Sequence, residues 1–67
     1  MTLHEAMEVV LKENGQSMSS TDIAKEINER NLYKKKDGSL IIPYQIVGRA
    51  KNYPHLFNRS STMISLK

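Results

Sequence analysis

The chain has 67 residues, with ten lysines and arginines, seven aspartates and glutamates, two histidines and no cysteine. A chain this short can form only one domain, Met1–Lys67, because a second would lack the apolar surface that offsets its own ordering entropy. Without cysteine there are no disulfides, and His4 and His55 are too far apart in sequence to indicate a metal site. No stretch approaches the roughly 18 apolar residues of a membrane span, and no signal peptide opens the chain. The composition predicts a soluble, cytoplasmic domain with no cofactor, no metal and no membrane contact.

Charge is divided unevenly along the chain. Met1–Tyr33 has three basic and six acidic residues, a net charge of −3, whereas Lys34–Lys67 has seven basic residues and one acidic residue, a net charge of +6. A polyanion such as the phosphate backbone of DNA would be attracted to the second half, with an affinity that falls as salt increases. The charge pattern therefore favours a nucleic-acid partner.

A first helix is predicted over residues 3–14. Thr2 and Glu5 have the spacing of a capping box, and Gly15 ends the helix because glycine adopts the left-handed conformation at little cost. Apolar residues at steps of three and four predict one buried stripe. This stripe consists of Leu3, Ala6, Met7, Val10 and Leu11.

A second helix is predicted to begin near Thr21, because the preceding serines offer N-cap groups, and to end at Asn31. Glu26 and Arg30 are four residues apart, a spacing that predicts a weak ion pair. The predicted buried stripe of this helix is Ile23, Ala24 and Ile27.

An exposed loop is predicted at Lys34–Ser39, which has three consecutive lysines, an Asp-Gly turn signal and no apolar residue. A third helix follows, with Pro43 in its first turn and Tyr53-Pro54 at its end. Its predicted buried face is Ile46, Val47 and Ala50. Its opposite face carries Gln45, Gly48, Arg49 and Asn52.

After Pro54 the helical spacing changes to an alternation that is typical of a β-hairpin. Its predicted arms are Leu56-Phe57 and Met63–Lys67, joined by a loop over Asn58–Thr62, and a short extended segment at Met18 is free to pair as a third strand. Three helices and a C-terminal hairpin predict a mainly α fold, the winged helix-turn-helix.

Five segments carry a more specific pattern, namely Thr2–Ala6, Ser20–Ala24, Asn31–Ser39, Gln45–Arg49 and Asn52–Phe57. Together they resemble the HARE-HTH domain, a winged helix shared by certain restriction endonucleases, chromatin proteins and an RNA polymerase subunit. The last two segments look like the bacterial branch that is often fused to nuclease domains. The chain departs from the family at Tyr33, where many members have tryptophan, and at Leu40–Ile42, which replaces a Thr-Pro pattern.

This resemblance implies an accessory DNA-binding module that serves a linked nuclease or restriction system and helps it to sense sequence or base modification. The chain ends at a predicted strand with no tail, so we expect it to be part of a longer protein.

The third helix carries the predicted recognition surface, where Gln45, Arg49 and Asn52 surround Gly48. Arginine can donate two hydrogen bonds to guanine, and glutamine or asparagine can pair with adenine, in a major groove that admits one helix. An ordinary solvated face is the competing interpretation, but a mid-helix glycine is costly and so indicates a function. The predicted contacts to DNA phosphates are Lys34, Lys35, Lys36, Lys51 and, in the hairpin loop, Arg59.

Two alternatives complete the sequence interpretation. No catalytic constellation or glycine-rich phosphate loop is present, so the domain itself is predicted not to be an enzyme. The acidic faces of the first two helices keep open a protein–protein interaction module of a transcription or DNA-processing complex. The aromatic residues are expected to pack in the core rather than to stack on unpaired bases; they are Tyr33, Tyr44, Tyr53 and Phe57.

Overall fold

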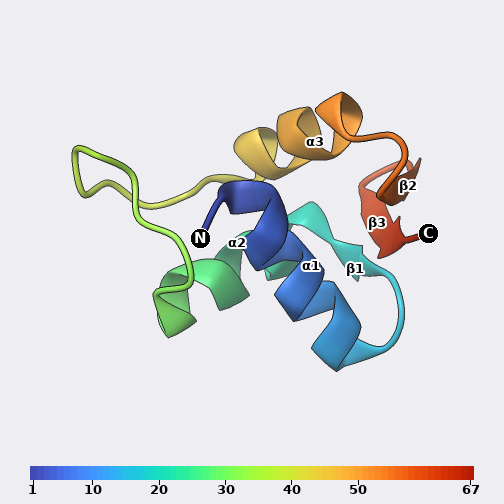
Figure 1. The fold of residues 1–67 in the computed structure, drawn as a ribbon, viewed down its shortest axis with the longest axis horizontal. Coiled ribbons are helices and arrows are strands. Elements are labelled where there is room, and N and C mark those ends of the chain that lie inside the picture. Colours follow the sequence, from blue (N-terminus) through green and yellow to red (C-terminus); the bar gives the residue numbers. More distant parts are fainter.

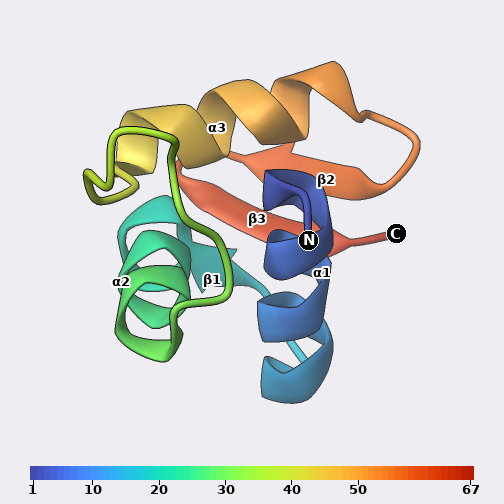
Figure 2. The ribbon, with the colours of Figure 1, turned by 60° about the vertical axis from the view of Figure 1, so that its left-hand side comes forward.

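A computed structural model describes all residues from Met1 to Lys67. Its elements, in chain order, are α1 (Leu3–Asn14), β1 (Met18–Ser19), α2 (Ser20–Arg30), α3 (Pro43–Asn52), β2 (Phe57–Ser60) and β3 (Met63–Leu66). The strands form an antiparallel sheet in the order β1-β3-β2. The views show α3 lying across one side of the molecule, with α1 and α2 beneath it and the hairpin alongside (Figures 1 and 2). The winged helix-turn-helix predicted from the sequence is confirmed.

The ends of α1 are where the sequence predicts them. The Thr2 hydroxyl accepts a hydrogen bond from the Glu5 N–H at 3.3 Å, and the Glu5 carboxylate accepts one from the Thr2 N–H at 2.8 Å. The Thr2 N–H and hydroxyl together lower the pKa of Glu5. Gly15 has a φ of 81° and donates its N–H to the Leu11 carbonyl. A complete capping box and a left-handed glycine therefore delimit the helix.

The helix α2 starts one residue earlier than predicted, because Ser19 rather than Ser20 is the N-cap and its hydroxyl accepts from the backbone two turns of chain further on, at Asp22. Asn31, with a φ of 53°, ends the helix as predicted. The predicted ion pair between Glu26 and Arg30 is wrong. Arg30 instead bonds Glu13 of α1 at 3.0 Å, so its charge joins two helices.

A single core lies between the three helices and the sheet, and it contains thirteen apolar side chains. The stripes predicted for α1 and α2 are confirmed, whereas in α3 only Ile46 and Ala50 are buried and Val47 is half-buried. The remaining core members are Ile41, Phe57 and Ile64. Each large side chain that is fully buried contributes about 1.5–3 kcal/mol relative to exposure, so this small core carries most of the stability.

One side chain organises the long connection between α2 and α3. Asn28 of α2 donates its amide to the Ile41 carbonyl at 2.8 Å, and its amide oxygen accepts from the Ile41 N–H at 2.9 Å. Ile41 itself is buried in the core. The segment from Asn31 to Ile42 is much longer than the roughly three- to four-residue turn of a typical helix-turn-helix. The Asn28–Ile41 bridge therefore anchors it where a short turn would otherwise do so.

The hairpin is tighter than the sequence predicts. β2 extends to Ser60, so the expected loop at Asn58–Thr62 shrinks to a turn at Ser61 and Thr62 in which Ser61 has a φ of 59°. The Thr62 carbonyl also accepts from the Ser20 N–H at 3.0 Å. The five-residue loop was wrong because strand pairing satisfies the backbone of this polar stretch, a gain that side-chain polarity does not reveal.

The aromatic residues were expected in the core, and one of them is not there. Phe57 is buried, and Tyr33 and Tyr53 pack against the core, with Tyr53 stacked on His4 of α1 at 4.1 Å between ring centroids. Tyr44, in contrast, is 83% exposed. It lies in the first turn of α3 on the side away from the buried Ile46, so helical geometry directs it to solvent. None of the helices is both long enough and apolar enough to cross a bilayer.

Replacing Asn28 tests the anchor. Asn28→Ala leaves both polar groups of Ile41 without their partner, and we expect it to lower the free energy of unfolding by about 1–3 kcal/mol in urea denaturation. Asn52→Ala, at an exposed position of α3, is the matched control and should change stability little. Equal stability of the two variants would contradict the anchoring role.

Candidate nucleic-acid interface

The start of α3 is stabilised by backbone geometry and by one side chain. Pro43 occupies its first turn, and Ile42, at the N-cap, has no acceptor to offer. The Gln45 amide oxygen instead accepts from the Ile42 N–H at 3.0 Å. Bidentate pairing with adenine would need that same oxygen. Gln45 therefore caps the helix, and reading adenine would cost it this bond.

The solvent face of α3 runs along the outer side of the molecule (Figure 2). Gly48, Lys51 and Asn52 are exposed, and Arg49 is half-buried at the edge of this face. Gly48 has an ordinary helical φ, and no other atom lies within 4 Å of the place where a Cβ would stand. The glycine is not needed for packing inside the domain, so its lack of a side chain leaves this stretch of the helix surface low and open.

The cations of the second half are free to meet an external anion. The ion pair between Arg30 and Glu13 joins the first two helices, and no lysine or arginine after Tyr33 forms a salt bridge. The acidic residues lie on α1 and α2, apart from Asp37. The folded domain therefore keeps the charge separation of the sequence, with its unpaired cations on the connection, α3, β2 and the C-terminus.

Arg59 does not lie in a hairpin loop as predicted but in the edge strand β2. Its register partner is Ile64, so its side chain leaves the same face of the sheet as Ile64 and Phe57. β2 packs against α3, which places the exposed Arg59 beside that helix. The structure therefore brings Arg59 to the same side as Arg49 and Lys51. Because the Thr62 carbonyl is bonded to α2, the wing is short and held against the body.

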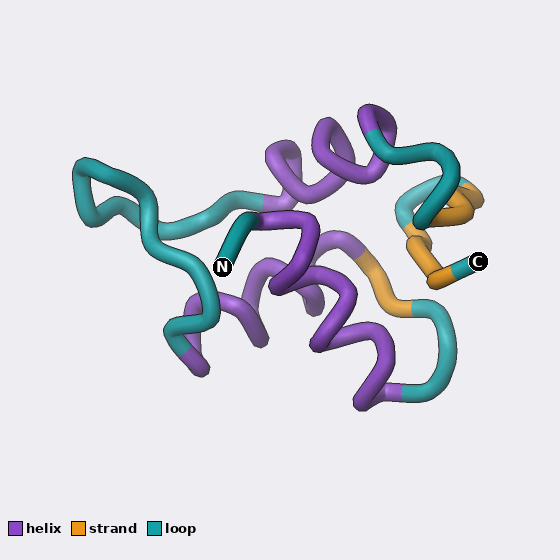
Figure 3. Tube along the Cα trace, in the orientation of Figure 1, coloured by secondary structure: helices purple, strands orange, loops and turns teal.

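The three predicted phosphate contacts at Lys34–Lys36 lie elsewhere, on the connection that loops away from the body before α3 (Figures 1 and 3). Lys34 and Lys36 are exposed and Lys35 is half-buried. A turn follows in which the Asp37 carboxylate accepts from the Ser39 N–H at 2.9 Å and from its hydroxyl at 2.7 Å. These bonds, the backbone one first, lower the pKa of Asp37. The lysines thus extend the basic surface beyond the N-terminal end of α3.

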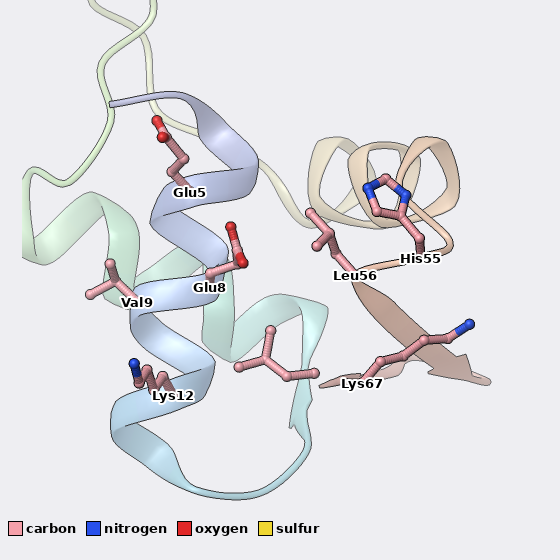
Figure 4. A pocket seen from close by; sticks show the side chains of 8 residues that line it. Glu5, Glu8, Val9, Lys12, His55, Leu56 and Lys67 are labelled. Atoms are coloured by element: carbon pink, nitrogen blue, oxygen red, sulfur yellow. The ribbon is translucent and has the colours of Figure 1, made fainter.

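A groove of about 530 Å³ lies elsewhere, between α1 and the residues that follow α3 (Figure 4). Its lining combines carboxylates of α1 with Lys12, Lys67, His55 and apolar side chains. The Glu5 carboxylate is occupied by the capping box. With charges of both signs, the groove offers no basic surface to a nucleic acid, and the candidate interface remains on the side of α3.

Comparison with known families decides the classification. Residues 1–40 match the family described as the helix-turn-helix domain of ASXL and restriction endonuclease proteins, HARE-HTH. The chain belongs to the HARE-HTH family. HARE-HTH domains are DNA-binding helix-turn-helix domains, and the resemblance seen in the sequence is confirmed. No curated protein and no solved structure matches the chain.

The family match has an informative boundary. It covers α1, β1, α2 and the connection as far as Leu40, whereas α3 and the β2–β3 hairpin lie beyond it. The HARE-HTH match thus rests on the part of the domain that builds the scaffold. It carries no residue-level information about α3, and for that reason the DNA-contacting residues must be argued from geometry.

The Asp37 turn is sensitive to acid. The folded-state pKa lies below the ordinary value of 3.8, so the turn stabilises the folded loop at higher pH and loses that contribution as pH falls through the folded-state pKa. We expect the Ser39 amide signal in NMR to titrate with the Asp37 carboxyl group below pH 3.8. Asp37→Asn, which retains an oxygen acceptor, is the control without titration. A Ser39 titration at the ordinary aspartate pKa would count against the turn.

Proposed function

We propose that this HARE-HTH domain binds double-stranded DNA with α3 in the major groove, Arg49 and Asn52 toward base edges, and Lys51 and Arg59 toward phosphates. The observation that carries the proposal is the exposed face of α3, which is flanked by cations that no carboxylate neutralises. Phosphate contacts supply affinity and position, while side chains in the groove supply sequence preference. Gln45 remains a weaker candidate for base contact, since its oxygen caps the helix.

The lysine loop extends this surface. Lys34, Lys35 and Lys36 precede the N-terminal end of α3, the end that enters the groove in helix-turn-helix complexes. At that position they would meet the phosphates that flank the groove, adding affinity without sequence preference. The short, tethered wing supports a limited role for the hairpin, with Arg59 reaching the backbone from beside α3 rather than from an extended loop.

We further propose that the domain is an accessory module of a longer, cytoplasmic protein and directs a linked nuclease or restriction enzyme to DNA. Support comes from the family, whose description includes restriction endonucleases. The domain brings binding, and catalysis would belong to the linked part. The extent of the reading frame around Lys67 tests this directly: a nuclease domain in the same frame is expected, and a stop codon directly after Lys67 with no upstream domain would refute the linkage.

A protein partner is the second candidate function. It is favoured by the exposed acidic side chains of α1 and α2, which lie away from the basic surface and include Glu13, Asp22 and Glu29. The two functions predict different surfaces in an NMR titration. Duplex DNA should shift the amides of α3, β2 and the lysine loop, whereas a domain that shows no amide shifts with DNA at low salt would favour the protein partner.

Removing the Arg49 charge tests the placement of α3. Arg49→Ala is expected to weaken binding to labelled duplex DNA at least about fivefold, measured by fluorescence anisotropy at low salt. Lys12→Ala removes one positive charge from the exposed side of α1, away from the proposed interface, and is the matched control. Wild-type affinity should fall steeply between about 50 mM and about 200 mM salt. Equal affinities of the two variants would refute the placement.

Gly48→Ala separates stability from binding. An alanine at this open helical position has no clash to make, so the variant should unfold at a free energy about 1 kcal/mol higher. If DNA approaches the helix closely here, the same variant should bind DNA more weakly. A more stable domain with unchanged affinity would show that Gly48 does not serve the interface.

A further inference from the structure

The start of α3 exposes three large apolar side chains within five residues. Leu40 is 67% exposed, Ile42 52% and Tyr44 83%; we call them the entrance patch. Single exposed apolar residues are common, but a cluster keeps apolar surface in water at about 25 cal/mol per Å² and typically marks an interaction site. The other large exposed apolar side chains, Met1 and Met63, lie outside this stretch.

The orientation of the entrance patch is built into the fold. Neighbouring side chains of an extended segment point to opposite sides, and Ile41 is buried while Asn28 holds both of its polar backbone groups. Leu40 and Ile42 must therefore both point away from the core. The N-cap residue Ile42 is itself extended, with φ −108° and ψ 157°. Tyr44 follows in the first turn of α3, so the patch surrounds the N-terminal end of the helix.

The surroundings of the patch identify the chemistry of its partner. Exposed lysines precede it in the loop, and Arg49 and Lys51 follow it on α3. The one nearby carboxylate, that of Asp37, is occupied by Ser39. A suitable partner is therefore anionic and also presents apolar groups. Duplex DNA meets both conditions in the major groove, where thymine carries a 5-methyl group at the base edge.

We propose that the entrance patch reads thymine 5-methyl groups in the major groove. This rests on the proposed function, since the N-terminal residues of a recognition helix are those that contact base edges. Gly48, one turn beyond Tyr44 and without neighbours around its Cβ position, leaves the same side of the helix low. The domain would then prefer A·T pairs at the site that faces the start of α3, a preference that cationic residues alone do not provide.

The test uses two labelled duplexes of one A·T-rich sequence, one with thymine and one with deoxyuridine at every thymine position. They differ only in the methyl groups, so the ratio of their Kd values isolates the methyl contact. For the wild-type domain we expect the deoxyuridine duplex to bind about three- to fourfold more weakly for each methyl contacted. Fluorescence anisotropy at constant low salt measures both affinities.

Variants assign the contact to the patch. Ile42→Ser removes an apolar side chain and supplies a favourable N-cap, so the helix should remain folded. It is expected to bring the ratio of Kd values toward one, as is Tyr44→Ser, whereas Tyr44→Phe should retain it. Met63→Ser, which removes an exposed apolar side chain of β3, is the matched control and should also retain the wild-type ratio.

The outcomes separate this proposal from the one on which it rests. Salt-dependent binding with equal Kd values for the two duplexes would overturn methyl reading and leave DNA binding intact. A loss of affinity in Ile42→Ser that is the same for both duplexes would also overturn it. Absence of binding to either duplex would overturn both proposals and would leave the apolar patch to a protein partner.

Discussion

The hydrogen bonds between Asn28 and Ile41 are the constraint on which the surface of this domain depends. A long connection between two helices has many conformations, and closing it costs entropy. The Asn28 amide matches both polar groups of one residue, so it fixes the position and the register of the connection at Ile41. Ile41 then fills the core, Ile42 becomes the N-cap of α3, and Pro43 begins the helix. The rotation of α3, and with it the set of exposed side chains, follows from that start.

Charge separation in the fold has a simple physical consequence. Acidic residues lie on α1 and α2, while the unpaired cations lie on the connection, α3, β2 and the C-terminus. A duplex approaching the domain would be attracted by one side and repelled by the other, which orients the encounter before any specific contact forms. Burial of the charges plays no part in this, because the cations of the basic side are largely solvated and their effect is screened by salt.

The family match and the proposed interface occupy different parts of the chain. Residues 1–40 include the core stripes of α1 and α2, the caps and the start of the connection. These features decide whether the domain folds. The side chains of α3 and β2 are exposed for the most part, so they can vary without loss of the core. A scaffold common to the family with a different reading surface is the expected result of that division.

The sequence by itself determined the local structure and the class of the domain. Caps, glycine and periodic apolar residues act within a few positions of each other, so α1 and α2, the Pro43 start of α3 and the alternating strands could be predicted from neighbouring residues. The basic half of the chain was equally evident. These signals sufficed for a winged helix-turn-helix and for a DNA-binding interpretation.

Only the tertiary structure decided which side chains are free. Arg30 meets Glu13 rather than Glu26, Asn28 meets Ile41 across the connection, and strand pairing moves Arg59 from a loop into β2. These partners are distant in sequence, and local spacing contains no information about them. Tyr44 was assigned to the core because it is aromatic, yet it is exposed since the rotation of α3 depends on how Ile41 is anchored. A candidate surface could be located from the sequence, but its composition required the long-range contacts that orient α3.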